Sequence, residues 1–180
     1  MESPRKILNE ELNRPSLEEF KAKKKIKVVL VLDNVRSAHN AGSVFRTGDA
    51  FAVEAIHCCG ITASPPNREL LKTSLSAQDS VEWKYFPSTQ ESISELKKRG
   101  YKIVAIEQIE KSISLEKFSF NRDEKIALVF GNEVKGISDE ILPLLDTAIE
   151  IPQFGTKHSF NISVTVGIVL WEYFSQKPHP

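Results

Sequence analysis

Short apolar runs alternate with helix-like segments along most of this chain. Six of these runs have the length of strands, at residues 28–32, 54–60, 81–86, 102–106, 125–131 and 148–151. Helical patterns lie between them, at 38–51, at 88–99 with Ser88 as N-cap, and in a short segment from 138 that Pro143 ends. This alternation predicts an α/β fold, in which helices cover both faces of a parallel sheet.

The last predicted helix is apolar nearly all round. It follows a loop punctuated by Pro152 and Gly155, begins with Ser159 as its N-cap and runs to Phe174. One face of this helix carries Ile162, Val166, Val169 and Tyr173, and other faces carry Val164, Ile168, Leu170 and Trp171. Such a helix must be covered on more than one side. In a chain of 180 residues we expect a second subunit to supply part of that cover.

The N-terminal segment differs in composition from the rest of the chain. Residues 1–27 hold eight Lys or Arg against five Asp or Glu, and five of the lysines lie within positions 21–27, although the whole chain has no net charge. A solvated helix end and a phosphate-binding arm both explain this charge. We therefore divide the chain into an accessory segment, residues 1–26, and one domain, residues 27–180.

Several classes of protein are disfavoured by what the sequence lacks. Cys58 and Cys59 are adjacent, so they form neither a CxxC pair nor a disulfide framework, and we expect buried thiols in a reducing compartment. The histidines show no metal-ligand spacing, and we expect no metal. There is no signal-peptide pattern and no membrane-length apolar run, which favours a cytoplasmic protein. Gly131 and Gly136 have P-loop spacing, but Ile137 follows where a lysine is needed.

Three polar, glycine-containing stretches follow predicted strands. They cover residues 33–47, 129–138 and 151–164. In α/β sheets, ligands bind beyond the carboxyl ends of the strands, so these stretches are the candidate site. Taken alone, Arg46 could be a structural ion-pair residue and Glu133 a loop cap.

In their order and spacing the three stretches resemble the motifs of the SpoU family, within the knotted SPOUT class of methyltransferases. The motifs correspond to residues 40–47, 128–138 and 151–164, and the resemblance spans about residues 27–174. It implies a ribose 2′-O-methyltransferase that acts on structured RNA and uses S-adenosylmethionine. It also implies a homodimer packed through the C-terminal helix, and a C-terminal trefoil knot that nothing else in the sequence indicates.

The resemblance also assigns roles to individual residues. Arg46 would be the catalytic residue, oriented by Asn40, while Ser159 and Asn161 order the site and Glu133 orders its loop. A guanidinium keeps its proton in proteins, so we expect Arg46 to stabilise the developing alkoxide and bind phosphate. The resemblance also implies that main-chain groups of the second and third motifs hold the cofactor. The positions concerned are Leu128, Phe130, Gly131, Ile151 and Phe160.

The RNA substrate is narrowed only by the short N-terminal segment. Relatives that modify ribosomal RNA often carry a separate binding domain, and about 27 residues cannot supply one. We therefore favour transfer RNA over ribosomal RNA, with Lys23, Lys24 and Lys25 holding phosphates, and expect no DNA or membrane partner. The alternatives left open are methylation of ribosomal RNA, methylation of a base, and a non-catalytic RNA-binding factor that keeps the fold.

Overall fold

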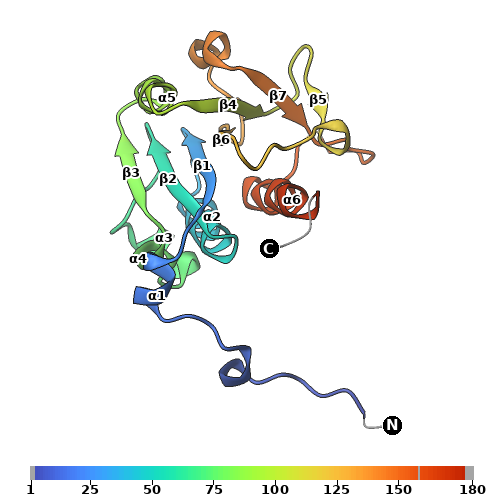
Figure 1. Ribbon diagram of the computed structural model, residues 1–180. Coiled ribbons are helices and arrows are strands. Elements are labelled where there is room, and N and C mark those ends of the chain that lie inside the picture. The colour runs from blue at the N-terminus through green and yellow to red at the C-terminus, as the bar shows by residue number, and fades with distance from the viewer. Residues whose placement is uncertain (1–2, 158, 177–180) are drawn as a thin grey trace.

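The computed structural model describes residues 3–157 and 159–176, and its centre is one parallel sheet. The strands follow the order β3-β2-β1-β6-β4-β7-β5, and neighbouring strands are parallel (Figure 1). Their bounds are β1 Ile26–Asp33, β2 Val53–Cys59, β3 Trp83–Phe86, β4 Tyr101–Ile106, β5 Ile113–Ser114, β6 Lys125–Phe130 and β7 Thr147–Glu150. The expected α/β fold with a parallel sheet is confirmed.

Helices lie on both faces of this sheet. The α-helices are α1 Leu17–Ala22, α2 Ala38–Ala50, α3 Arg68–Ser74, α4 Ala77–Ser80, α5 Thr89–Lys98 and α6 Ile162–Ser175. Short 3₁₀ helices are η1 Asn9–Leu12, η2 Leu115–Lys117 and η3 Asp139–Leu144. Helices α2, α3, α4 and α6 pack on one face, and α5 and η3 pack on the other.

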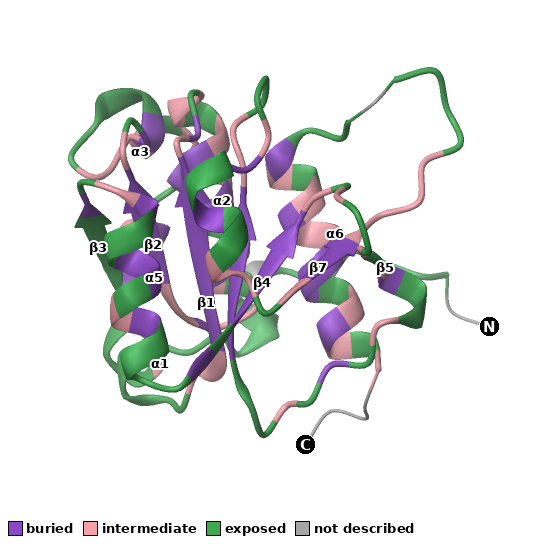
Figure 2. Cartoon of the chain, turned by 90° about the horizontal axis from the view of Figure 1, so that it is seen from above, coloured by how far each residue is buried: buried purple, intermediate pink, exposed green. Residues whose placement is uncertain are grey.

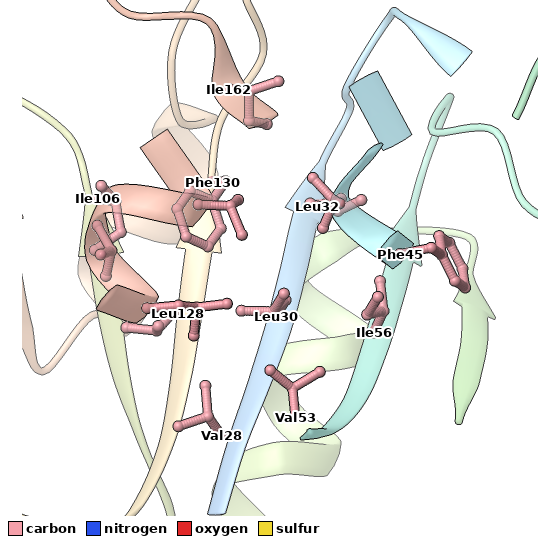
Figure 3. Close-up of a cluster of buried hydrophobic side chains, with 14 of the residues drawn as sticks. Val28, Leu30, Leu32, Phe45, Val53, Ile56, Ile106, Leu128, Phe130 and Ile162 are labelled. Carbon is pink, nitrogen blue, oxygen red and sulfur yellow. The ribbon is translucent and has the colours of Figure 1, made fainter. Parts of the chain in front are cut away.

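The pattern of side chains along the strands explains these two layers. Successive residues of a strand point to opposite faces. Leu30 of β1 and Leu128 of β6 therefore join the core beneath α2 and α6, whereas Val31 and Val129 join the core beneath α5. Figure 3 shows Leu30 and Leu128 side by side within the first of these cores. The central strands are buried on both faces (Figure 2).

Several predicted boundaries differ from the structure. Helix α6 begins at Ile162 and its N-cap is Asn161, not Ser159. The segment after residue 138 is a 3₁₀ helix that continues through Pro143 to Leu144, so Pro143 does not end it. Pro143 has no N–H to donate, which disfavours a regular α-helix in this segment. Strand β5 and helices α3 and α4 were not predicted, since two to seven residues carry too little periodic signal.

Helix α6 has the mixed burial that its sequence indicates. Ile162, Val166, Val169 and Tyr173 are buried against the sheet, and Leu170 is buried with them. Val164 is 49% exposed and Trp171 is 62% exposed, so the remaining apolar surface faces outward. Both cysteines are buried, and burial raises the pKa of each thiol to about 12, as expected of structural thiols.

Residues 3–16 run away from the body of the fold, whereas α1 lies beside α4 (Figure 1). The apolar side chains Leu8, Leu12 and Leu17 of the N-terminal segment are exposed. In the part of the chain that the structure describes, no helix is long and apolar enough to cross a membrane.

Candidate functional site

The three polar stretches meet where the order of the strands reverses. The chain proceeds outward from β1 through β2 to β3, and β6 and β4 lie on the other side of β1. Ligands of open α/β sheets bind at such a switch point, beyond the carboxyl ends of the strands. Asp33 ends β1 and Phe130 ends β6 at this edge.

A cavity of about 490 Å³ lies at this edge of the sheet. It is formed by the segments that follow β4, β6 and β7 together with the start of α6. Its volume falls within the range of roughly 300–1,000 Å³ typical of small-molecule sites. Apolar and polar residues share its wall, and the lining includes Ile106, Glu107, Ile109, Phe130, Gly131, Gly136, Ile137, Glu150, Ile151, Ser159, Phe160 and Ile162.

The loop after β6 is folded tightly against itself. Asn132 and Gly136 exchange backbone hydrogen bonds of 2.8 and 2.9 Å, and the Asn132 carboxamide oxygen accepts the N–H groups of Val134 and Lys135. A Cβ at Gly131 would lie 2.3 Å from the Gly136 carbonyl carbon, and Gly136 has a φ of +71°. Both positions therefore require glycine, and the loop can present its main chain to the cavity.

Glu133 ties this loop to the start of α2. Its carboxylate accepts the N–H of Arg36 at 2.9 Å, the N–H of Ser37 at 3.2 Å and the Asn40 side-chain amide at 3.2 Å. Partial burial acts to raise the pKa of Glu133, but these donors outweigh it and hold the pKa below its usual value. Glu133 is therefore a loop-ordering carboxylate that stays ionised at neutral pH.

Asn40 then joins α2 to α6. Its side-chain oxygen accepts a hydrogen bond of 3.1 Å from the Asn161 amide, while the Asn161 oxygen caps α6 by accepting the N–H of Ser163 at 2.9 Å. Glu133, Asn40 and Asn161 come from three separate stretches of the sequence, and the structure brings them into one hydrogen-bonded chain.

The other predicted residues lie in several environments. Arg46 is exposed on α2, six positions after Asn40 and thus about 9 Å further along the helix. The Asn40 side chain forms its hydrogen bonds with Glu133 and Asn161 and not with Arg46. Phe130, Gly131 and Ile151 line the cavity, as do the exposed residues Ser159 and Phe160. Leu128 is fully buried in the core and is not part of that lining. His158, in the third stretch, lies outside the described residues.

The lysines predicted to hold phosphates are not equivalent. Lys23 and Lys24 are exposed after α1. Lys25 instead lies over the Phe20 ring, 3.2 Å from its centroid, and its ammonium donates to the Phe20 carbonyl. Burial lowers the pKa of Lys25 from its ordinary value. This cation is therefore already engaged within the N-terminal segment.

Two carboxylates that sequence reasoning did not single out also hold the site. Asp33 is fully buried and accepts four hydrogen bonds: the Ser138 N–H at 2.8 Å, the Ser138 hydroxyl at 3.1 Å, the Thr89 hydroxyl at 2.5 Å and the Asn34 amide at 2.9 Å. Glu107 lines the cavity and accepts the N–H of Ile137 at 3.2 Å. The position of both residues just at or after the end of an apolar strand was the one signal available.

Within residues 3–157 and 159–176, no group of three or more His, Cys, Asp or Glu side chains could hold a metal ion. His57 is buried away from the cavity, where its Nδ1 lies 2.8 Å from the Ser92 hydroxyl. Burial lowers the pKa of His57 to about 4, so it is neutral at physiological pH. His57 therefore has a structural environment.

The chain is similar to several proteins of known name. It is 32% identical over 146 residues to a tRNA (guanosine(18)-2′-O)-methyltransferase of Borreliella burgdorferi, which covers 80% of this chain and 64% of that relative. It is 30% identical over 167 residues to the Thermus thermophilus protein of the same name, over 93% of this chain and 84% of that relative. Thus it spans just under two thirds of the first relative and most of the second.

A solved structure agrees with these sequence matches. The TrmH/SpoU tRNA modifying enzyme of Aquifex aeolicus superimposes with a TM-score of 0.77 at 27% identity, over 89% of this chain and 81% of that one. The model of the SpoU rRNA Methylase family matches residues 27–171, which include all three polar stretches. The chain therefore belongs to the SpoU rRNA Methylase family, as the resemblance of its motifs predicts.

Proposed function

We propose that this chain catalyses the transfer of a methyl group from S-adenosylmethionine to a ribose 2′-hydroxyl of RNA. The observation that carries the proposal is the hydrogen-bonded chain from Glu133 through Asn40 to Asn161. It joins the three family motifs around one cavity at the switch point of the sheet. A binding protein without catalytic activity has no need of this arrangement beside an exposed arginine.

The cavity fits the cofactor in volume and in chemistry. Ile106, Ile151 and Phe160 offer apolar surface for an adenine ring, and the loop from Gly131 to Gly136 forms another part of the cavity wall. A Cβ at Gly131 would collide with the main chain of Gly136, so the loop can fold back on itself only with glycine at this position. When bound there, S-adenosylmethionine supplies an electrophilic methyl group on its sulfonium sulfur.

Arg46 is our candidate catalytic residue. A ribose hydroxyl is a weak nucleophile, so negative charge that develops on its oxygen must be stabilised while the methyl acceptor is held in line. The exposed Arg46 guanidinium is protonated and can bind a phosphate of the target nucleotide and stabilise that oxygen. Asn40 and Asn161 fix the start of α2 against α6, which positions the helix that carries Arg46.

The named relatives support one choice of RNA substrate. Both named relatives act on transfer RNA, whereas the family name refers to ribosomal RNA. We propose transfer RNA as the substrate, with Lys23 and Lys24 in the basic segment at residues 1–26 as exposed phosphate contacts. The remaining residues, 27–180, form the methyltransferase domain, and we expect it to work in the cytoplasm.

We also propose a homodimer that packs through α6. The exposed apolar residues Val164 and Trp171 lie on the helix's outward side and would be covered by the same helix of a second copy. The trefoil knot that the resemblance implies is part of the proposal. An experimental structure whose backbone path between the two termini is unknotted would contradict the knot.

The first test is transfer of labelled methyl from S-adenosylmethionine to transfer RNA and, separately, to ribosomal RNA from cells that lack this protein. We expect label in transfer RNA, at a site that resists alkaline cleavage because a methylated 2′-oxygen cannot attack the neighbouring phosphate. Arg46→Ala should abolish it, and Arg46→Lys, which keeps the charge, serves as the matched variant. Label in ribosomal RNA alone would overturn the substrate, and unchanged turnover by Arg46→Ala would overturn the role of Arg46.

A further inference from the structure

Arginines in the folded body divide into partnered and unpartnered groups. Arg99 forms an ion pair of 2.7 Å with Glu54, and Arg122 donates to the Tyr173 carbonyl at 3.0 Å. By contrast, the side chains of Arg36, Arg46 and Arg68 make no ion pair or hydrogen bond with any residue in the part of the chain that the structure describes. All three are exposed.

The three unpartnered arginines lie on elements that follow one another in the chain, and the first of these elements is bound to Glu133 of the cavity wall. Arg36 is in the loop between β1 and α2, where its own N–H donates to Glu133. Arg46 is on α2, and Arg68 is the first residue of α3. Figure 2 shows α2 and α3 side by side.

The contact between α2 and α3 fixes this arrangement. A Cβ at Gly42 would lie 2.2 Å from the Leu70 carbonyl oxygen, so only glycine permits the two helices to approach this closely. The Thr73 hydroxyl also donates to the His39 carbonyl across the contact, at 2.9 Å. Arg68 is thus held on the same side of the molecule as the start of α2.

The nearby carboxylates are bound to other groups. On α3 the acidic residue is Glu69, which pairs with Lys72 at 2.7 Å and with His39 at 3.0 Å, and the Lys72 hydrogen bond lowers its pKa. On α2 the acidic residue is Asp49, which accepts the Ser80 hydroxyl near the helix's far end. Glu133 is held by backbone amides and Asn40. None of these groups forms an ion pair with Arg36 or Arg68 within the described residues.

We infer that Arg36 and Arg68 are RNA-binding residues that contact phosphates on either side of the nucleotide presented to Arg46. The inference rests on the proposed function and adds residues to its substrate surface. Guanidinium groups suit this task because each presents several donors in a planar fork that matches phosphate oxygens. A set of three exposed arginines that form no ion pair, beside carboxylates that are bound to other groups, is complementary to a polyanion.

The test measures binding of transfer RNA from cells that lack this protein, as a function of KCl concentration. For Arg36→Ala and for Arg68→Ala we expect the slope of log K against log salt to fall by about 0.7–0.9, as each loses one phosphate contact. The dissociation constant should rise severalfold, and KM for RNA should rise more than kcat falls. Affinity for S-adenosylmethionine should not change, because neither residue lines the cavity. The melting temperature should not change, because both side chains are exposed.

Lys98→Ala is the matched control. Lys98 is exposed, has no ion pair among the described residues, and lies on α5, which covers the opposite face of the sheet. Its loss should leave RNA binding unchanged. Arginine variants that bind with the wild-type affinity and salt slope, or an equal loss in Lys98→Ala, would overturn the inference. Wild-type protein that binds RNA through these arginines without methylating any would instead refute the proposed function alone.

Discussion

The close contact between α2 and α3 gives a prediction in which two effects have opposite signs. In Gly42→Ala, the new Cβ would lie 2.2 Å from the Leu70 carbonyl oxygen and 2.2 Å from the Thr73 hydroxyl oxygen. Alanine improves helix propensity by about 1 kcal/mol. Overpacking costs about 1–3 kcal/mol, and loss of the hydrogen bond from Thr73 to His39 costs about 1 kcal/mol more.

The expected net effect of Gly42→Ala is a loss of about 2 kcal/mol in the free energy of unfolding. For a chain of this size that corresponds to a fall of about 4–8 °C in melting temperature. Urea titration and thermal melting, followed by circular dichroism, measure both quantities. Adding Thr73→Ala should restore only part of the loss, because the Leu70 carbonyl belongs to the backbone and stays in place.

Gly167→Ala is the comparison for this prediction. Gly167 is also inside a helix, α6, but a Cβ there meets nothing within 4 Å in this chain. At low protein concentration we expect the helix propensity alone to act, with a gain of about 0.5–1 kcal/mol. If Gly42→Ala were as stable as wild type, or more stable, then α3 does not pack on α2 as described and the placement of Arg68 loses its basis.

Other predictions concern the buried carboxylate, the buried histidine and the dimer. Asp33→Asn should lower the free energy of unfolding by about 1–3 kcal/mol and weaken S-adenosylmethionine binding, because an amide cannot accept all of the hydrogen bonds that Ser138 and Thr89 donate. Titration calorimetry that shows an unaltered affinity would contradict the expectation that Asp33 positions the cofactor site. The pKa of His57 is about 4 in the folded chain and about 6.5 in the unfolded chain. Between these two pH values only the unfolded chain binds a proton at His57, so the free energy of unfolding decreases as pH falls from 6.5 towards 4, by about 2 kcal/mol at pH 5. If the urea midpoint of His57→Gln falls with pH as much as that of the wild type, groups other than His57 cause the loss. Trp171→Glu should give monomer or aggregate in sedimentation experiments, and an intact dimer would argue against packing through α6.

Much of the fold could be predicted because the apolar runs are long and regular. Helix α2 and the N-cap Ser88 of α5 lie where the sequence places them. The start of α6 was predicted wrongly because Ser159 and Asn161 are both good N-caps. The choice depends on tertiary structure, since the Asn161 side chain also donates to Asn40, which lies 121 positions away in the sequence.

The candidate site was predictable in part for a related reason. Glycine spacing and the polar stretches mark which loops matter, and the family resemblance assigns them. A single sequence does not reveal which distant donors a strand-end carboxylate meets. Asp33 contacts Ser138 and Thr89, and Glu107 contacts Ile137, and these partners are known only once the sheet order is known. The same applies to the unpartnered state of Arg36 and Arg68.

The Asn40 side chain constrains how this site can evolve. It donates from its nitrogen to Glu133 and accepts at its oxygen from Asn161, so both ends of one amide are in use. An aspartate at this position would place two carboxylates next to each other, where they repel. An alanine would leave Glu133 and Asn161 without their hydrogen-bond partner. Replacement at any of the three positions therefore requires compensation at another. Descendants of this protein should exchange these residues together or keep all three.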